Sequence, residues 1–526
     1  MLEIFSKYYN YLFLIVVIFY NFFPKKIRAF VLLLVSLLFF YILSSNLIIY
    51  LLITVISVYS SALLISKICE KRKLALKEAS TEDKKAIKES FKRRKRLVLF
   101  VCILVNVSFL FVFKYLKFFT INTNAILTWL NVDYRFKVLK IIAPIGISFY
   151  SLQALSYLLD VYHEKISADK NIIRVALFIS FFPQIMEGPI ARYEDTAEQL
   201  YEGNKITYHN FCFGAQRILW GLFKKMVIAD RLNVLVKTVF ADYASFSGPI
   251  IFLGAAGYTT MLYMEFSSAI DVVVGIGEMF DVKIPENFRQ PFFSKNISEF
   301  WARWHISLGK WFKDYIYYPI SLSKPMKKLT GKARKTLGNH FGPLLSGTIA
   351  LFAVWSLNGL WHGAGWTFIL FGMYHFVLIS LGNMTQPFLN NFCIKHNLNR
   401  NNVVYRVFQS IKVTILVIFG ELIFRASSVR AAMEMFQRMA TSFHVKGSEL
   451  SCLGLDIPDC FVLVIALLIV FIVGVLKERD VHIREEISKK KIGIRWILFY
   501  VLIFSIIIFG AYGPGYEPVD PIYADF

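Results

Sequence analysis

The stretch NLIIYLLITVISVYSSALLI, residues 46–65, decides the fold class, because it contains no charged side chain. A helix of about 20 predominantly apolar residues is long enough to cross the hydrocarbon core of a bilayer. Similar runs recur along the chain, and they are continuous, without the alternation of outer-membrane barrel strands. The clearest lie at 11–23, 29–44, 46–65, 97–115, 138–159, 172–186, 210–228, 249–264, 343–357, 364–382, 408–424, 460–476 and 494–511.

These runs predict an all-α, polytopic integral membrane protein that forms a single domain over 1–526. Several runs are short or interrupted by Gly or Pro, so we expect about ten to thirteen membrane helices. The first run lacks a basic segment before it and a small-residue cleavage site after it. We therefore interpret it as a first membrane span and not as a removable signal.

The composition of the 526 residues supports this class, with 56% hydrophobic and only 18% charged residues. Soluble chains are closer to a quarter charged, so a water-soluble enzyme and a disordered chain are both excluded. The formal net charge is +23. The basic residues cluster in short loops between apolar runs, which is how membrane proteins set their orientation. We therefore expect no nucleic-acid partner.

The basic loops predict the topology. Residues 67–96 hold thirteen Lys and Arg against five acids, 324–340 hold six and no acid, and 477–495 hold seven against four. We expect all three on the cytoplasmic side. Residues 1–10, the segment 427–459 and the acidic tail 511–526 are then expected outside. The 67–96 run is either a solvated, partly helical loop that only sets topology or a binding surface for anionic lipid headgroups.

A first candidate for chemistry is the aromatic, amphipathic part of the segment 285–340. Trp301, Trp304, His305 and Leu308 are spaced to share one helical face, whereas Arg303 falls off that face. Such a helix either anchors the chain at the membrane surface or forms the wall of a tunnel or donor site. Both interpretations stay open on the residues alone.

A second candidate surrounds His362, which lies between apolar runs and beside Gly359, Gly363 and Gly365. The glycines allow close approach by a substrate or by another helix. Asn358 is placed to hydrogen-bond the imidazole if the segment is helical. His375 follows in the next run. An intramembrane histidine is either a satisfied structural group or a general base, proton relay or ligand contact.

Other chemistries have little support in the sequence. We find no HExxH, GxSxG or Walker A motif, and no GxGxxG followed by a strand. The six cysteines lie far apart, without CxxC or a Cys/His spacing typical of zinc. We therefore predict no metal site and no resident cofactor.

Six motifs occur along the chain in a characteristic order, namely APIGISFY at 143–150, SYLLDVY at 156–162, FFPQIMEGPIAR at 181–192, PENF at 285–288, FWARWH at 300–305 and GLWHG at 359–363. Taken together, they resemble the membrane-bound O-acyltransferase superfamily, in its bacterial branch of alginate O-acetyltransferases and teichoic-acid D-alanyl transferases. The resemblance covers most of the chain.

The resemblance implies helices arranged around a central chamber. His362 matches the family's catalytic histidine, and His305 matches the second histidine of its FWxRWH motif. We expect substrate contacts from the remaining motif residues, namely Asn358, Trp361, Trp304, Arg303, Asn287, Asp271 and His375. The sequence departs from the family at 265–271, where EFSSAID replaces the usual DFSGYSD run and keeps Asp271.

The resemblance further implies transfer of an acyl group, preferentially acetyl, from a cytoplasmic thioester to hydroxyls of an extracytoplasmic cell-surface polysaccharide. The donor is expected to be acetyl-CoA or an acyl carrier protein thioester. Membrane lipid surrounds the protein in the bacterial plasma membrane, and an extracytoplasmic acetyltransferase-like partner is expected to assist. D-alanyl transfer toward teichoic acid is the alternative within the family. A transporter without covalent chemistry is the alternative from another class.

Overall fold

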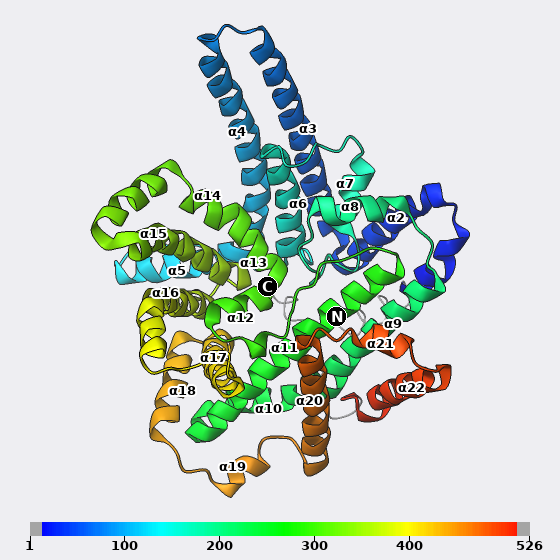
Figure 1. Ribbon diagram of the computed structural model, residues 1–526, viewed down its shortest axis with the longest axis vertical. Helices are drawn as coiled ribbons and strands as arrows, with labels where there is room; N and C mark the ends of the chain where they lie inside the picture. Colours follow the sequence, from blue (N-terminus) through cyan, green and yellow to red (C-terminus); the bar gives the residue numbers. More distant parts are fainter. Residues whose placement is uncertain (1–12, 513–526) are drawn as a thin grey trace. The chain divides into compact units, whose positions relative to one another are not determined.

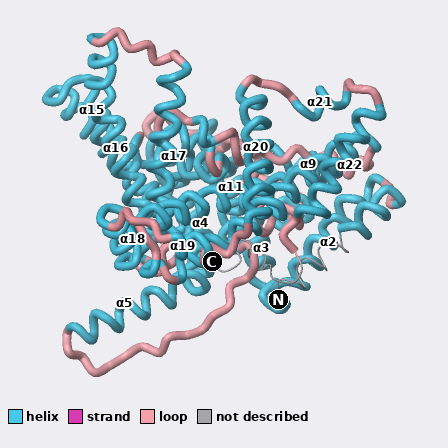
Figure 2. The backbone as a smooth tube through the Cα atoms, turned by 90° about the horizontal axis from the view of Figure 1, so that it is seen from below, coloured by secondary structure: helices cyan, strands magenta, loops and turns pink. Residues whose placement is uncertain are grey.

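The computed structural model describes residues 13–512, in which helices joined by loops form the regular secondary structure and no β-strand occurs (Figures 1 and 2). The only extended pairing in this range is a single antiparallel bridge between Phe288 and Trp304. The expected all-α class is therefore confirmed. The described residues form two compact units, one comprising 13–214 with 276–285 and the other 215–275 with 286–512.

The first unit is built on a long antiparallel pair, α3 (Ile48–Glu78) and α4 (Asp83–Leu110), which stands out in Figure 1. The basic run 67–96 lies on the ends of these two helices and on their connection, so its expected partly helical character is confirmed. An extended loop over 130–146 follows α5 (Figure 2). The remaining helices are η1 (Tyr20–Phe22), α2 (Lys25–Ser44), η2 (Ser45–Leu47), η3 (Phe111–Tyr115), α5 (Leu116–Trp129), α6 (Ile147–Tyr162), α7 (Ile172–Ser180) and α8 (Tyr193–Glu202).

The second unit holds the candidate site, and α9 (Tyr208–Phe223) and α11 (Gly248–Met279) contribute residues to both units. Its other helices are η4 (Lys224–Ala229), α10 (Asp230–Ala241), η5 (Tyr243–Ser245), η6 (Pro291–Phe293), α12 (Ile297–Arg303), α13 (Ile306–Phe312), η7 (Lys313–Tyr317), α14 (Tyr318–Ser321), α15 (Lys324–His362), α16 (Trp366–Lys395), α17 (Val403–Arg425), α18 (Val429–Thr441), α19 (Gly447–Ser451), α20 (Ile457–Glu478), α21 (Ile483–Ser488) and α22 (Ile492–Phe509).

Glycines let the central helices of this unit pack closely. A Cβ on Gly359 of α15 would lie 2.5 Å from the carbonyl oxygen of Phe368 on α16, and one on Gly363 would lie 2.2 Å from the Phe368 ring. The close approach that these glycines permit is therefore made by a neighbouring helix. The packing fixes the end of α15, where His362 is the last helical residue.

Eight segments within 13–512 are long and apolar enough to cross a membrane, compared with the ten to thirteen expected. The predicted spans at 172–186 and 210–228 correspond to α7 and α9, which have only 9 and 16 residues. Both are shorter than the roughly 20 residues that a spanning helix needs. The apolar windows of α20 and α22 are only 6% buried by protein. Their bare apolar surfaces suit contact with lipid.

The basic segment 324–340 is not the loop that its composition suggested. Its residues form the first part of α15, which bends at Gly338, where φ is +77°. The segment 427–459 contains α18 and α19. The expected exterior positions of residues 1–10 and of the tail from 513 fall outside the described residues. The cytoplasmic and extracellular assignments of the loops stay predictions.

Candidate active site

A cavity of about 560 Å³ lies in the second unit between the α12–α13 segment and helices α15 and α16. Three polar side chains in its wall are buried, namely His305, Asn358 and His362. We call this cavity the chamber. Its walls are otherwise mostly aromatic and aliphatic, with contributions from Trp301, Trp304, Leu308, Leu351, Val354, Trp355 and Ile379. An apolar chamber with a few convergent polar groups is the usual form of a small-molecule site.

The prediction of one helical face is wrong, because the four residues do not lie on a single helix. All four nevertheless line the chamber, namely Trp301, Trp304, His305 and Leu308. Helix α12 ends at Arg303 and α13 begins at Ile306. His305 between them has a left-handed backbone with φ +47°, which is rare and strained for a residue other than glycine.

Pairing with the segment after the PENF motif explains the break. The Arg289 amide donates to the carbonyl oxygen of Arg303 over 2.9 Å, and the Ile306 amide donates to the carbonyl oxygen of Asn287 over 3.0 Å. The Phe288–Trp304 bridge lies between them. These backbone bonds replace those that a continuous helix would make. They turn His305 out of helical register and into the chamber.

Asn287 determines which ring nitrogen of His305 carries the proton. Its side-chain oxygen accepts from the Ser307 backbone amide at 2.9 Å and lies 3.4 Å from His305 Nδ1. An oxygen that accepts from a backbone amide offers no proton, so Nδ1 must be the donor. Burial lowers the pKa of His305 to about 3. The ring is therefore neutral near pH 7, with its proton on Nδ1 and its lone pair on Nε2.

His362 is buried, with 7% of its surface exposed, and shares an aromatic neighbour with His305. The centre of the Trp361 indole lies 5.5 Å from the His305 ring and 5.0 Å from the His362 ring. Phe424 of α17 packs edge-on against His362 at 5.2 Å. The structure thus brings the two predicted catalytic histidines together at one chamber, with Trp361 packed against both rings.

Asn358 also faces the chamber, one turn before His362 on α15. Asn358 does not form the predicted hydrogen bond with the His362 ring. Its amide oxygen accepts no hydrogen bond from any described residue. A buried amide oxygen without a partner is costly and calls for an explanation. Asn358 is thus available to bind a substrate.

His375 lies behind the chamber wall and not in it. The indole N–H of Trp301 donates to His375 Nδ1 over 3.2 Å, so the neutral ring carries its proton on Nε2. His375 is fully buried and also packs against Trp355 and Phe371. Both Trp301 and Trp355 line the chamber, so His375 supports its wall from outside.

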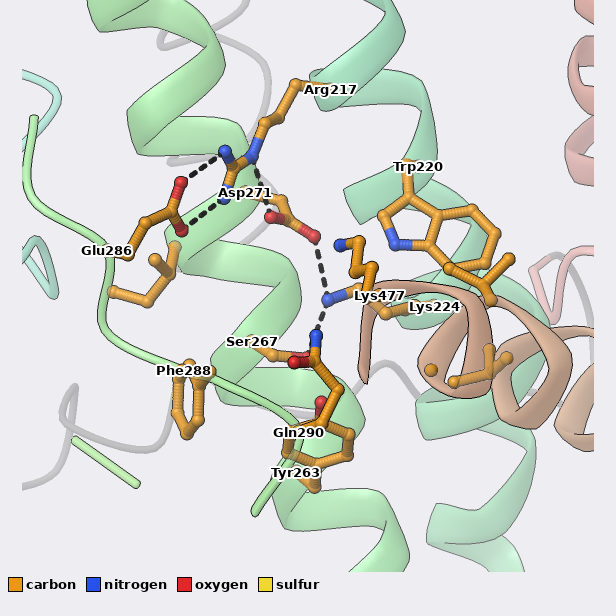
Figure 3. Close-up of a pocket in the computed structure, with 14 residues that line it drawn as sticks. Arg217, Trp220, Lys224, Tyr263, Ser267, Asp271, Glu286, Phe288, Gln290 and Lys477 are labelled. Atoms are coloured by element: carbon orange, nitrogen blue, oxygen red, sulfur yellow. Dashed lines mark hydrogen bonds and ion pairs between the residues drawn. The ribbon is translucent and has the colours of Figure 1, made fainter. Parts of the chain in front are cut away.

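Two other predicted substrate contacts lie elsewhere in the same unit. Arg303 pairs with Glu299 and with Glu478 of α20. Asp271 pairs with Arg217 and Lys224 beside a second, smaller cavity (Figure 3). The structure does not bring either residue into the chamber wall.

The sequence interpretation missed some residues of this unit. Lys310, Lys313 and Tyr317 line the chamber, and both lysines are exposed. Glu421 is 2% exposed on α17, and one of its carboxylate oxygens has no hydrogen-bond partner among the described residues. Glu421 lies in the apolar run 408–424, so the search for polar residues in apolar runs could have found it.

The sequence matches a known protein family over most of the region that holds the chamber. Residues 92–424, more than half of the chain, match the sequence model of MBOAT, the membrane-bound O-acyltransferase family. The chain belongs to this family. The family match and the eight candidate spans make this MBOAT protein a multi-pass membrane protein. The motifs that carry the resemblance, from 143–150 to 359–363, all fall within the matched region.

Relatives of this MBOAT protein differ in their named activities. A probable alginate O-acetylase of Pseudomonas syringae is 32% identical over 70% of this chain and 65% of its own length. A peptidoglycan O-acetyltransferase of Helicobacter pylori is 34% identical over 55% of each chain. A teichoic acid D-alanyltransferase of Bacillus subtilis is 29% identical over 47% of this chain and 60% of its own length. The match thus spans just under two thirds of the alginate relative.

Proposed function

We propose that this protein is a membrane O-acyltransferase that moves an acyl group, preferentially acetyl, from a cytoplasmic thioester donor to hydroxyls of an extracytoplasmic cell-surface polysaccharide. The observation that carries the proposal is the chamber, in which His305, His362 and the unpartnered amide of Asn358 converge within aromatic walls. Two of the relatives above are named O-acetyltransferase or O-acetylase, which supports acetyl as the group transferred.

The chamber residues fit the chemistry of acyl transfer. The acceptor hydroxyl attacks the thioester carbonyl and gives its proton to His362, forming a C–O bond and a tetrahedral oxyanion. The Asn358 amide N–H stabilises that oxyanion. The C–S bond then breaks, and the departing thiolate takes the proton from His362. Atoms and charge balance without a resident cofactor, because the thioester supplies the activated acyl group.

His305 has a supporting role in this mechanism. It is neutral, with Nδ1–H held by Asn287 and the lone pair on Nε2. Its Nε2 accepts a hydrogen bond from a neighbouring hydroxyl of the acceptor polysaccharide and thereby orients the attacking hydroxyl toward the thioester and His362. The neutral state avoids placing a second positive charge beside His362 when His362 takes up the proton.

D-alanyl transfer from a carrier protein is the second candidate. Lys310 and Lys313 lie exposed at the chamber, and the first part of α15 adds six basic residues without an acid in 324–340. Such a surface suits docking of an acidic carrier. A D-alanyltransferase among the relatives is consistent with this candidate.

Reconstitution in vesicles tests the proposal. The vesicles receive radiolabelled acetyl-CoA outside or D-alanyl carrier protein outside, and hydroxyl-bearing polysaccharide inside. Label on the glycan that depends on acetyl-CoA and on His362 is the expected result. Label only from the carrier supports the second candidate. Glycan or solute flux that survives His362→Ala, without transfer of label, contradicts both and supports a transporter.

A further inference from the structure

The second, smaller cavity of the same unit is a charged site that the proposed reaction does not use. It has a volume of about 60 Å³. One water needs roughly 10–15 Å³ of such volume, so the cavity has room for a polyatomic group. Its wall comes from α9, η4, α11, the segment 286–290 and the end of α20 (Figure 3). It shares no lining residue with the chamber.

A network of ion pairs builds the floor of this cavity. Arg217 donates to both carboxylate oxygens of Glu286 at 2.6 Å and to Asp271 at 2.9 Å. Lys224 is buried and donates to Asp271 at 2.8 Å and to Ser267 at 2.6 Å. Both carboxylates in the wall are therefore already neutralised (Figure 3).

Lys477 adds a further cation to this wall, and no described residue forms an ion pair or hydrogen bond with its ammonium group. Because the two carboxylates neutralise Arg217 and Lys224, Lys477 gives the cavity one excess positive charge. Two neutral donors also line the space, the indole N–H of Trp220 and the side-chain amide of Gln290, and neither hydrogen-bonds to a described residue. Three unused donors and an excess cation favour an anion with several acceptor oxygens.

The backbone of Gln290 is held in a strained conformation. Its φ and ψ are +39° and +64°, a left-handed conformation that a residue other than glycine rarely adopts. Strain of this kind persists where the surrounding structure holds a side chain for a function. Here it places Gln290 in the cavity wall.

The position of Lys477 on α20 indicates the source of the anion. The 22 residues of α20 span about 33 Å, close to the thickness of a hydrocarbon core of about 30 Å. Lys477 is the residue before the last of this helix, so it reaches headgroup depth when α20 crosses the bilayer. Val470 and Val473 of α20 also line the cavity, and the apolar window of this helix is only 6% buried by protein. The cavity therefore opens where a lipid phosphate lies.

We propose that this cavity, formed by Trp220, Lys224, Gln290 and Lys477, binds the phosphate headgroup of an anionic phospholipid. The lipid's acyl chains lie along the apolar surface of α20. The phosphate oxygens accept hydrogen bonds from the indole, the amide and the ammonium group. A soluble phosphate compound shares this headgroup chemistry but lacks the acyl chains. The two sources are distinguished by experiment.

Native mass spectrometry of the whole protein in detergent tests the proposal, with phosphatidylglycerol and phosphatidylcholine added in equal amounts. Wild-type protein is expected to retain phosphatidylglycerol preferentially. Loss of one cation at headgroup depth weakens binding by about fivefold, so Lys477→Gln should lower its retention by that factor. Trp220→Phe keeps the ring and removes one donor, and should lower retention by a few-fold. Lys491→Gln, an exposed lysine away from the cavity, is the matched control.

Separate arms use inorganic phosphate and coenzyme A as competitors. Neither is expected to displace the lipid, because neither contacts the apolar face of α20. Displacement by either one, with no preference for phosphatidylglycerol, would overturn the lipid assignment in favour of a soluble anion. Equal retention by wild type and Lys477→Gln, or an equal loss in Lys491→Gln, would overturn the site itself. These readouts are independent of acyl transfer.

Discussion

The indole N–H of Trp301 donates to Nδ1 of His375 over 3.2 Å, and this bond joins the chamber wall to a histidine outside the chamber. The two residues lie 74 positions apart in sequence, on α12 and α16. Without the bond, the Trp301 ring loses the partner that fixes its orientation. The geometry makes His375 a positioning residue for the chamber.

His375→Ala should therefore reduce kcat of acyl transfer, by about fivefold for one lost neutral hydrogen bond of about 1 kcal/mol. Trp301→Phe, which removes only the donor, should cause a similar loss. The double variant should lose little more than either single variant, because both act through one bond. Steady-state kinetics of the three variants in proteoliposomes measures this.

His375→Gln is the control, because its amide oxygen can accept from the indole. It should recover most of the lost kcat. A purely structural role predicts equal defects in His375→Ala and His375→Gln that follow the loss of thermal stability. Additive losses in the double variant would contradict the positioning role.

His362→Ala should lower the rate of transfer by about 10²–10⁴-fold, the usual contribution of a general base. The protein should still fold, because the ring lies at the end of α15 beside the chamber. Thermal unfolding in detergent and transfer of radiolabel check the two parts separately. His396→Ala, an exposed histidine after α16, should change neither. Wild-type rates from folded His362→Ala protein would refute the mechanism.

Local patterns in the sequence predicted the features that depend on nearest neighbours along the chain. Continuous apolar runs predicted the long helices, since length and apolarity alone fit a bilayer. The four-residue spacing of Asn358 and His362 placed both on α15, and both line the chamber. Resemblance to the family then selected His305 and His362 as partners.

Relations between distant residues could not be predicted in the same way. The break at His305 depends on backbone bonds to Asn287 and Arg289, which local helical spacing does not report. Arg303 was expected at the substrate, but it reaches Glu478, 175 residues further along the chain. The local sequence around either residue does not predict such an ion pair. Tertiary contacts override helical propensity at these positions.

The neutral state of His305 predicts how stability depends on pH. Its pKa is about 3 in the folded protein against 6.5 in the unfolded chain, because of burial. Between these values the unfolded state binds a proton that the folded state does not, so the free energy of unfolding falls as the pH is lowered from 6.5 toward 3. The loss of thermal stability between pH 6.5 and 4.5 should be shallower in His305→Gln. Exposed His444 is the control, and His444→Gln should leave the slope unchanged. Equal slopes in His305→Gln and wild type would contradict the buried neutral ring.

Substitution of Asn358 should lower the rate of acyl transfer without lowering the stability of the fold. Its amide oxygen has no hydrogen-bond partner among the described residues, so Asn358→Leu removes a desolvation cost without breaking a bond. The melting temperature should stay constant or rise. Transfer should fall by about 10²–10³-fold if the amide stabilises the oxyanion. A melting temperature that falls in parallel with activity would instead mark Asn358 as a structural residue.

Arg303 should affect stability more than substrate binding. It pairs with Glu299 on its own helix and with Glu478 on α20, and it does not line the chamber. Arg303→Gln leaves both partly buried carboxylates without their cation, which should cost about 2 kcal/mol and lower the melting temperature. The KM for the donor should change little. Glu478→Gln should give a smaller loss, because Arg303 then keeps Glu299. A large rise in KM at unchanged stability would instead support Arg303 as a substrate contact, as the family resemblance predicted.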